Sequence, residues 1–384
     1  MPEHKKQHYV PQCVLRNFTN DQNKFYLFQV LKNRIIDQAV PYKDHCYTDY
    51  LYGKDGTWEN WLAKHEIEIA PIFRLILEGT PLSIEQKNSV KRFILVQHMR
   101  TEKAIDRNCN IMSDIYTKII PLVAKKEGLE ISPLDAKIFA DNRVKDYDRT
   151  EIAIEDMTFV VVEENLSHFD DLRLAILHSK SEMFVCSDHP VSISNLSYKH
   201  GGIGVDCAGL IVTMPISPEY CLMLIDDGIY DYENEQWQIE LDDFDVKKLN
   251  YRQFVQCKGI MFSVNKSTLE NVKTHFESLY IDNPLREWCI QLGLSDPIII
   301  NRKVIEIKNT YRSAIEKMIP KLYAQDDFNG LSKLIIKPEF RPYGNDINSM
   351  FYRFGDSNDI PDKYRLVGSE YPDLIKKYYI NRGR

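Results

Sequence analysis

The spacing of apolar residues changes along the chain, and these changes constrain the fold more than any single motif does. Aromatic and β-branched residues fill 25–30 and 34–36, and the polar break between them predicts a β-hairpin. From residue 58 onward, apolar residues recur at helical spacing. This spacing predicts a helix that ends before Gly79 and a second, longer helix over about 83–118.

The second half of the chain has a different pattern. A shorter helix is predicted over 134–143, and beyond residue 151 short apolar runs are bounded by turn residues. These runs predict strands at 159–162, 183–186, 210–212 and 220–225. A helical pattern over 243–258 precedes one more predicted strand at 259–264. We therefore expect an α+β fold with an N-terminal β-hairpin, central long helices and a mixed β-sheet region in the second half.

The length of 384 residues is enough for one large domain or two ordinary ones. We expect an α+β domain over 1–265. The texture of the sequence then changes, and 266–384 is expected to be a C-terminal extension or wrap, or a separate small module. A hydrophobic content of 43% and a charged content of 27% are typical of a soluble globular protein.

Charge and composition exclude several classes of protein. The formal net charge of −7 argues against a globally basic nucleic-acid binder, although a local basic groove is compatible with it. Neither a bilayer-spanning apolar run nor the apolar core of a signal peptide is present, so we expect a cytoplasmic protein without a membrane partner. No cysteine pair has C-x-x-C spacing. Residues 201–204 lack the third glycine of a dinucleotide fingerprint, and no nucleotide cofactor is indicated.

The most informative residues are polar side chains at positions where the helical pattern calls for apolar ones. Glu59 and Glu66 lie two turns apart on the apolar side of the first long helix, and Gln97 and Arg100 interrupt the stripe of the second. A charge that points into a core needs a partner. Glu66 and Arg100 therefore either pair across the two helices and orient them, or line a polar site that binds a metal or an anion.

Two further segments carry candidate chemistry. Residues 187–190 follow an apolar run, and strand ends in open sheets present functional groups. Either Asp188 forms an Asx-type turn that caps its own backbone, or it is a metal ligand or acid–base group with His189 beside it. His8 opens the segment 8–12, and a lone histidine is either an ordinary hydrogen-bonded residue or a ligand.

These positions also resemble the landmarks of a known family. The landmarks are His8-Tyr9-Val10-Pro11-Gln12, Leu15-Arg16-Asn17-Phe18, the helix with Glu59, Leu62 and Glu66, Gln97-x-x-Arg100-Thr101, Ser187-Asp188-x-Pro190, Pro215-x-Ser217-Pro218 and Asn250. Over about residues 4–265 the chain resembles the bacterial domain-of-unknown-function 4238 (DUF4238) family. The resemblance implies a bacterial or phage-borne cytoplasmic protein of mixed α and β structure, and it supplies no activity.

Two positions depart from the family's pattern. Glu102 stands where the family usually has a proline after Arg-Thr, so we expect the helix to continue unbroken there. His189 stands where members often carry Asn, which argues against an essential role for this histidine. The other residues that break the hydrophobic pattern are also landmarks of the family, and this agreement favours a shared polar site.

The first functional hypothesis is an enzyme. It is a metal-dependent phosphodiester hydrolase, hence a nuclease, acting in bacterial phage defence or as a toxin. The carboxylates of Glu59, Glu66 and Asp188 would bind a divalent cation, Mg²⁺ or Mn²⁺, through hard oxygen ligands.

The same hypothesis assigns roles to the other polar residues. Arg100 would hold a phosphate bidentately, and Gln12 and Gln97 would contact the substrate. His8 would carry the proton. The candidate catalytic residues are therefore His8, Glu66, Arg100 and Asp188.

The second hypothesis is a non-catalytic module that binds nucleic acid or a partner protein. Tyr and Phe are interleaved with Arg in 340–343 and 351–354. Stacking on aromatic rings combined with basic contacts suits single-stranded nucleic acid. A solvated surface with buried aromatics is the structural alternative for a chain of negative net charge.

Overall fold

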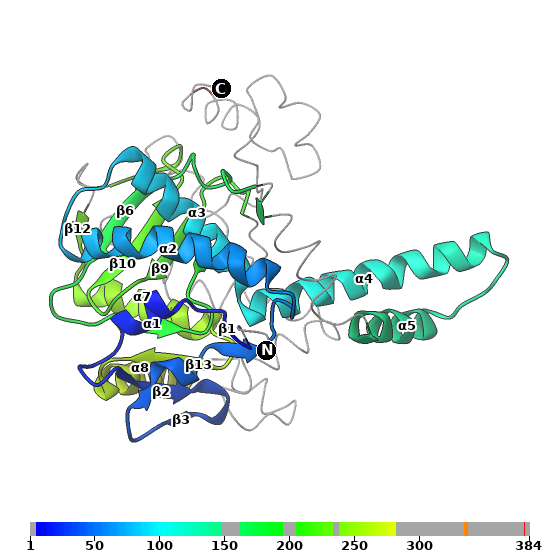
Figure 1. Ribbon diagram of the computed structural model, residues 1–384, viewed down its shortest axis with the longest axis horizontal. Helices are drawn as coiled ribbons and strands as arrows, with labels where there is room; N and C mark the ends of the chain where they lie inside the picture. Colours follow the sequence, from blue (N-terminus) through cyan, green and yellow to red (C-terminus); the bar gives the residue numbers. More distant parts are fainter. Residues whose placement is uncertain are drawn as a thin grey trace.

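The computed structural model of the chain describes residues 5–146, 162–163, 165–194, 205–232, 238–281, 334–336 and 380. Helices and mixed β-sheets share these ranges (Figure 1). The expected α+β class, with its N-terminal hairpin, long central helices and strand-rich second half, is confirmed. No helix in the described part of the chain is both long and apolar enough to cross a membrane.

One five-stranded sheet, with the order β12-β6-β10-β9-β8, is built from the second half of the chain. Its strands are β6 (Arg173–His178), β8 (Ser192–Ser194), β9 (Ile211–Pro215), β10 (Tyr220–Ile225) and β12 (Gln238–Glu240). Neighbouring strands are antiparallel, except that β12 runs parallel to β6. Every residue of β10 is buried, as expected for a central strand covered on both faces. The strands predicted at 210–212 and 220–225 are confirmed by β9 and β10.

The second five-stranded sheet joins segments that lie far apart in the sequence. Its strands are β2 (Lys24–Gln29), β3 (Arg34–Ile35), β4 (Val40–Pro41), β7 (Cys186–Ser187) and β13 (Ile260–Ser263). Their order is β3-β2-β13-β7, and β4 also pairs with β2. The predicted hairpin is confirmed by β2 and β3, whose turn contains Asn33 with a φ of 48°. The predicted strand at 259–264 is confirmed by β13, whereas the run predicted at 183–186 enters β7 only at its last residue.

Helices α2 (Thr57–Leu77) and α3 (Ile84–Arg100) lie over the strands β6, β10 and β9 (Figure 1). Phe73 of α2 meets Phe93 of α3 edge to face, with ring centroids 5.4 Å apart. The start of α3 is a capping box, in which the Ser83 hydroxyl accepts from the amide of Gln86 and the Gln86 side chain accepts from the amide of Ser83. The main hydrophobic core lies between these helices, both sheets and α1 (Gln12–Asn17).

The prediction of a single helix over 83–118 is wrong, because the helix is interrupted at Thr101. Helix α3 ends at Arg100, and α4 (Glu102–Lys126) starts after Thr101, whose ψ of 154° is extended. The Thr101 hydroxyl accepts from the amide of Ala104 and caps α4. The expectation that the helix continues through Glu102 is therefore also wrong: the break is present without a proline.

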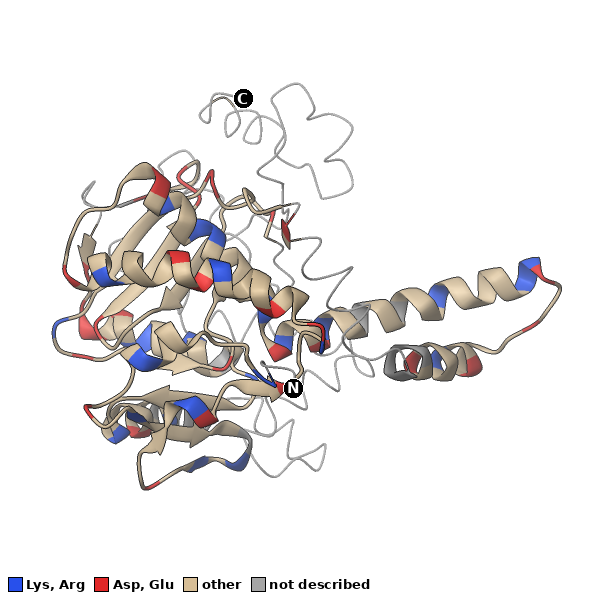
Figure 2. Cartoon of the chain, in the orientation of Figure 1, with Lys and Arg blue, Asp and Glu red and all other residues tan. Residues whose placement is uncertain are grey.

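Beyond the break, α4 and α5 (Pro133–Asp146) form an antiparallel helical hairpin that projects from the rest of the fold (Figure 1). The Ser113 hydroxyl of α4 donates to the Asp141 carboxylate of α5 over 2.5 Å. The short helix predicted over 134–143 is confirmed by α5. The charged residues of both helices carry both signs (Figure 2).

A smaller core lies on the other face of the second sheet. Helix α8 (Lys266–Ile281) packs there against β2 and β13, and α7 (Asp243–Gln256) packs against β7 and α8. Phe28 and Met261 of the sheet meet Phe254 of α7 and Leu269 of α8 in this core. The neighbouring residues Leu27 and Phe262 point into the main core instead, so β2 and β13 are covered on both faces. The helix predicted over 243–258 is confirmed by α7.

Two short strand pairs complete the described fold. Strand β1 (Lys6–His8) pairs with β5 (Tyr47–Asp49), and β11 (Tyr230–Tyr232) pairs with β14 (Leu334–Ile336). The division into 1–265 and 266–384 stays a prediction, although α8 and β14 already connect the later range to elements of the earlier one. The predictions for 159–161, 201–204, 340–343 and 351–354 lie outside the described residues.

Candidate functional site

The centre of the candidate site is an ion pair between the two long helices. The guanidinium of Arg100, at the end of α3, is 1% exposed, and its Nη1 lies 2.7 Å from Oε1 of Glu66 in α2. The Glu66 side chain is 28% exposed, so it connects this buried cation to the surface. The expected pairing of Glu66 with Arg100 across the helices is confirmed.

Arg100 also holds the first strand and the loop before α2. Its Nη2 donates to the main-chain carbonyl of His8 over 2.6 Å, and its Nε lies 3.4 Å from the hydroxyl of Tyr52. That hydroxyl in turn donates to the carbonyl of Arg100 over 2.8 Å. Burial lowers the pKa of Arg100, but Tyr52 and Glu66 more than offset burial and leave this pKa above its ordinary value. Arg100 is therefore permanently charged and acts as a positioning residue.

Two glutamines fasten the same strand through main-chain hydrogen bonds. Gln97 of α3 is fully buried, and its Nε2 donates to the carbonyl of Tyr9 over 2.9 Å. Gln7 donates to the carbonyl of Gly53 and accepts from the amide of Tyr52. The Oε1 atom of Gln97 is buried without a hydrogen-bond partner in the described structure. The side-chain NH2 group of Gln97 thus holds the backbone at Tyr9, while its oxygen can still accept a hydrogen bond.

His8 presents a free ring nitrogen at this junction. Its side chain is buried, and Nε2 has no hydrogen-bond partner in the described structure. Burial lowers the pKa of His8, while a main-chain hydrogen bond with Lys43 and the charge of Glu66 act in the opposite direction. Because Nε2 is unpaired, Nδ1 makes the bond to Lys43, and a bond that favours the protonated ring indicates donation to the Lys43 carbonyl. The ring is therefore neutral, with its lone pair on Nε2.

The side chains of Tyr52, Glu59 and Cys13 also lie near the Glu66–Arg100 pair. The charges of Glu59 and Glu66 act on the buried hydroxyl of Tyr52, whose pKa burial raises above its ordinary value. Burial also raises the pKa of the half-buried Cys13 thiol to about 12, and Glu66 raises it further, so Cys13 stays a thiol at neutral pH. Sequence reasoning missed both Tyr52 and Cys13. Only Cys13 had a local signal, since it directly follows the 8–12 segment.

Asp188 has a different environment, at the end of β7. Its Oδ1 accepts from the amide of Lys258 over 2.6 Å, and its Oδ2 accepts from the amides of Gly259 and Ile260 over 2.6 and 2.9 Å. Asp188 thus caps the backbone between α7 and β13 rather than its own turn. Both carboxylate oxygens are engaged by main-chain donors, so Asp188 does not fit the role of a metal ligand beside Glu66.

His189 belongs to a buried cluster at the break between α3 and α4. Its Nδ1 lies 2.5 Å from the Thr101 hydroxyl, and its ring centroid lies 5.6 Å from that of His98. Burial lowers the pKa of His98 to about 3, and burial with the charge of Lys103 holds the pKa of His189 well below its ordinary range. Both rings are therefore neutral at physiological pH.

Residues 6–267 match the sequence model of the family described as "Protein of unknown function (DUF4238)". The chain belongs to the DUF4238 family. No curated protein and no solved structure matches the chain. The DUF4238 match spans β1 to the start of α8, and it therefore contains both the Arg100 junction and the Asp188 turn.

The structure divides the DUF4238 landmarks between two places. His8, Glu66, Gln97 and Arg100 meet at the junction of β1, α2 and α3, and Glu59 acts on the same Tyr52 hydroxyl. Gln12 begins α1, and Asp188 caps 258–260. Among the described residues, no group of three or more His, Cys, Asp or Glu side chains is arranged to hold a metal ion.

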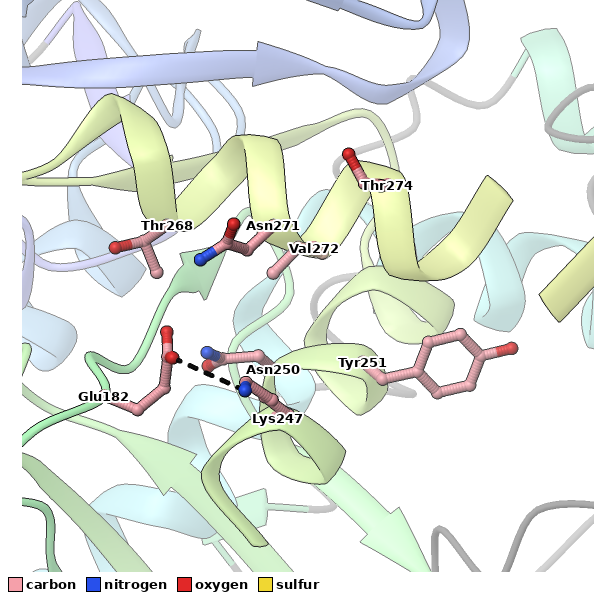
Figure 3. A pocket seen from close by; sticks show the side chains of 8 residues that line it. All are labelled: Glu182, Lys247, Asn250, Tyr251, Thr268, Asn271, Val272 and Thr274. Atoms are coloured by element: carbon pink, nitrogen blue, oxygen red, sulfur yellow. Dashed lines mark ion pairs between the residues drawn. The ribbon is translucent and has the colours of Figure 1, made fainter. Parts of the chain in front are cut away.

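A cavity of about 420 Å³ in this DUF4238 chain lies apart from both places, between α7 and α8 (Figure 3). Glu182 and Lys247 form a long ion pair of 4.0 Å in its lining. The family landmark Asn250 also lines it, but its side chain accepts from the amide of Val185 and donates to the carbonyl of Met183. None of the candidate catalytic residues lines this cavity.

Proposed function

We propose that this DUF4238 chain is a phosphodiester-cleaving enzyme, a nuclease, in which His8 accepts the proton of the attacking hydroxyl. The observation that carries the proposal is the unpaired, buried Nε2 of a neutral His8 next to the Glu66–Arg100 pair. A buried polar atom without a partner costs free energy, and such atoms in a folded protein call for an explanation. A ligand that hydrogen-bonds to Nε2 supplies one.

The surroundings of His8 suit general base catalysis. A base must be unprotonated at the working pH, and burial keeps the pKa of His8 below its ordinary value. Glu66 favours the protonated ring, so it stabilises the imidazolium that forms when the proton is transferred. The Glu66 side chain is also partly exposed, at 28%, so a substrate can reach it from solvent.

Arg100 has a positioning role in this proposal rather than the phosphate-binding role expected from the sequence. Its guanidinium donates to Glu66 and to the carbonyl of His8, and it is buried. These bonds fix the direction of the carboxylate and the backbone of β1 that carries the base. Gln97, which donates to the carbonyl of Tyr9 directly after that strand, assists in the same way.

The substrate class that fits such a site is RNA. The donor set expected for Mg²⁺ or Mn²⁺ does not fit, because Asp188 is engaged by main-chain amides, so no step is assigned to a metal. The 2′-hydroxyl of RNA is a nucleophile beside its own phosphodiester. Its proton passes to Nε2 of His8, the 2′-oxygen bonds to phosphorus, and the bond to the 5′-oxygen breaks as that oxygen takes a proton from solvent.

The test is cleavage of matched single-stranded RNA and DNA by the purified full chain, with Mg²⁺, with Mn²⁺ and with a chelator. We expect RNA cleavage that survives the chelator. General base catalysis contributes about 10²- to 10⁴-fold, so His8→Asn should lose at least about 100-fold in rate. The rate should rise with pH to a plateau, and the midpoint of this rise should lie below about pH 6.5, because burial lowers the pKa of His8 from that value.

His65→Asn is the matched control for this experiment. Burial also lowers the pKa of His65, but its ring packs on Trp61, with centroids 4.3 Å apart, one residue before Glu66 on the same helix. Its rate should stay within about 3-fold of the unchanged chain. The proposal fails if the unchanged chain cleaves no nucleic acid, or if His8→Asn keeps its full rate. Binding of RNA without cleavage would favour the non-catalytic module instead.

A role in bacterial phage defence or as a toxin is part of the same proposal. A cytoplasmic nuclease that attacks cellular RNA should arrest growth on expression. We expect this arrest to disappear with His8→Asn and with Glu66→Ala, while His65→Asn remains toxic. Equal toxicity of all variants would separate the growth effect from the proposed site.

A further inference from the structure

The cavity between α7 and α8 has two facing walls of polar side chains (Figure 3). Glu182, Lys247 and Asn250 form one wall, and Thr268 and Asn271 of α8 form the other. The volume of about 420 Å³ lies within the range of about 300–1,000 Å³ that is typical of small-molecule sites. The cavity is therefore large enough for a small molecule that bonds to both walls.

Two of these side chains are enclosed at the cavity without a hydrogen bond. Thr268 is 5% exposed, and its hydroxyl makes no hydrogen bond with any described residue. The Glu182 side chain is 16% exposed, and its ion pair with Lys247, at 4.0 Å, is too long for a hydrogen bond. Buried polar groups in folded proteins are nearly always hydrogen-bonded, and each exception calls for an explanation. A ligand that donates to Glu182 and bonds to Thr268 supplies one.

The backbone that carries Glu182 is fixed on both sides. The Ser179 hydroxyl donates to the carbonyl of Glu182 over 2.5 Å. The side chain of Asn250 accepts from the amide of Val185 and donates to the carbonyl of Met183, each over 2.8 Å. The DUF4238 landmark Asn250 thus positions the segment from which Glu182 reaches the cavity. A binding group that is held in place before the ligand arrives loses little freedom on binding.

The two charges of the first wall select among possible ligands. A charged carboxylate forms its strongest hydrogen bonds with a cationic donor, so Glu182 favours an ammonium group. A ligand that is only a cation would also face Lys247, and one that is only an anion would face Glu182. A molecule that carries both charges can pair with both residues. The ammonium and carboxylate of a free α-amino acid are attached to one carbon atom, so they can lie side by side against two protein charges 4.0 Å apart.

The remaining lining argues against a ligand with an aromatic ring. Tyr251 is the aromatic residue among the labelled lining residues, and its ring points away from the space between the walls (Figure 3). A nucleobase would therefore have no ring to stack on. Val272, which is 7% exposed, adds a small apolar contact beside the polar groups.

We propose that this cavity binds a free α-amino acid. The ammonium group of the ligand donates to the Glu182 carboxylate and to the Thr268 hydroxyl. Its carboxylate accepts from Lys247 and from the side-chain amide of Asn271, which points toward the α7 wall (Figure 3). None of these residues belongs to the Arg100 junction, so the site is independent of the proposed nuclease.

The test is calorimetric titration of the purified full chain with each of the common L-α-amino acids in turn. We expect at least one of them to bind with a dissociation constant below about 1 mM. The methyl ester of that amino acid lacks the carboxylate charge, and its N-acetyl derivative lacks the ammonium charge. Each derivative should bind at least about 10-fold more weakly, because it loses a charge-assisted hydrogen bond.

Two variants test the residues that carry the proposal. Glu182→Gln removes the charge that pairs with the ammonium and should weaken binding at least about 10-fold. Thr268→Val keeps the shape of the side chain, removes only the hydroxyl and should weaken binding about 3- to 10-fold. Glu270→Gln is the matched control, because Glu270 lies on α8 outside the cavity lining and is 54% exposed in its pair with Lys266. It should bind as the unchanged chain does.

Several outcomes would overturn the proposal. One is that no amino acid binds at up to about 10 mM. Another is that the methyl ester or the N-acetyl derivative binds as tightly as the amino acid itself. A third is that Glu182→Gln and Thr268→Val keep full affinity, or that Glu270→Gln weakens binding as much as they do. If Glu182→Gln loses its helical circular dichroism, Thr268→Val decides alone. The titration contains no RNA, so its failure and the failure of RNA cleavage are separate results.

Discussion

Two carboxylates of this chain break the hydrophobic pattern in the same way, and the structure uses them differently. Glu66 faces a side-chain cation, is 28% exposed and acts on His8, whose Nε2 has no hydrogen-bond partner in the described structure. Asp188 is buried and accepts from three consecutive main-chain amides. A carboxylate whose oxygens are engaged by backbone donors stabilises the fold, whereas one that is partly exposed beside an unpaired histidine nitrogen also acts on the pKa of that histidine.

The same contrast separates two histidines. Nε2 of His8 is unpaired and lies near Glu66, whereas His189 contacts the Thr101 hydroxyl and is enclosed beside His98. Burial lowers the pKa of both rings. A lowered pKa alone therefore does not distinguish a candidate catalytic histidine from a structural one. The distinction comes from whether the ring nitrogens already have hydrogen-bond partners.

The largest effect should come from Asp188→Ala, which removes the acceptor of three amides. Hydrogen bonds to a charged group contribute about 1.5–3 kcal/mol, and the orphaned amides add a further cost, so we expect a loss of about 3–5 kcal/mol in the free energy of unfolding. Urea unfolding at pH 7 measures it. Asp188→Asn keeps an acceptor oxygen and should lose about half as much. A loss under about 1 kcal/mol for the alanine variant would contradict the structural role of Asp188.

The second effect is a loss of stability in acid that depends on His98 and His189. An unfolded histidine takes up its proton near pH 6.5, whereas the folded His98 does so only near pH 3, so the unfolded state binds more protons between these values. Stability is therefore present above about pH 6.5 and falls as the pH drops toward 3. A histidine with the lowered pKa of His98 removes about 2 kcal/mol between pH 7 and pH 5.

His189→Asn tests this contribution, because Asn fills similar space and does not titrate. The fall in unfolding free energy between pH 7 and pH 5 should become smaller in this variant, because the folded chain holds the pKa of His189 well below its ordinary value. An unaltered pH dependence in His189→Asn would mean that the ring is not held neutral.

A smaller effect is expected for Glu66→Gln. The amide oxygen still accepts from Arg100, and the partial exposure of Glu66 screens the lost charge, so the free energy of unfolding should fall by only about 1 kcal/mol. Under the proposed function, RNA cleavage should fall much further than stability. A stability loss as large as that of Asp188→Ala would remove the distinction between the two carboxylates.

The smallest effect is expected for Lys258→Met, which separates the role of the Lys258 side chain from that of its main-chain amide. The amide of Lys258 binds Asp188, while its side chain pairs with Glu102 and Asp106 over 2.7 and 2.6 Å. Lys258→Met removes only the side-chain pairs, whose members are 26–32% exposed, and should cost about 0.5–1 kcal/mol. Urea unfolding in parallel with Asp188→Ala makes the comparison direct. Equal losses would show that the side-chain pairs, not the backbone cap, hold this turn.

Local features of the fold were predictable from the sequence, and long-range ones were not. The hairpin of β2 and β3 and the helices α2 and α7 follow from apolar spacing over a few residues. The break at Thr101 carries no glycine or proline, and its hydroxyl finds a partner in His189, 88 positions away. Helical spacing continues through this residue, so the pattern alone predicts one helix where there are two.

In the candidate site, too, some contacts could be predicted from the sequence and others could not. Glu66 and Arg100 could be paired from the sequence, because polar residues on the apolar sides of adjacent helices need each other. The partners of Asp188 are main-chain amides about 70 positions later. Almost every residue has such an amide, so the sequence does not indicate which ones bind Asp188. Tyr52 sits in the loop before α2 with no periodicity to single it out.

The position of β13 in the second sheet has a consequence for how this chain is made. Strand β13, near residue 260, lies between β2 and β7 and pairs with β2, which ends at residue 29. During synthesis the N-terminal strands emerge long before the strand that completes their sheet, and until then β2 has an open edge. Folding of this layer must wait for nearly the whole family region to leave the ribosome, and any chain cut short before β13 carries an aggregation-prone strand.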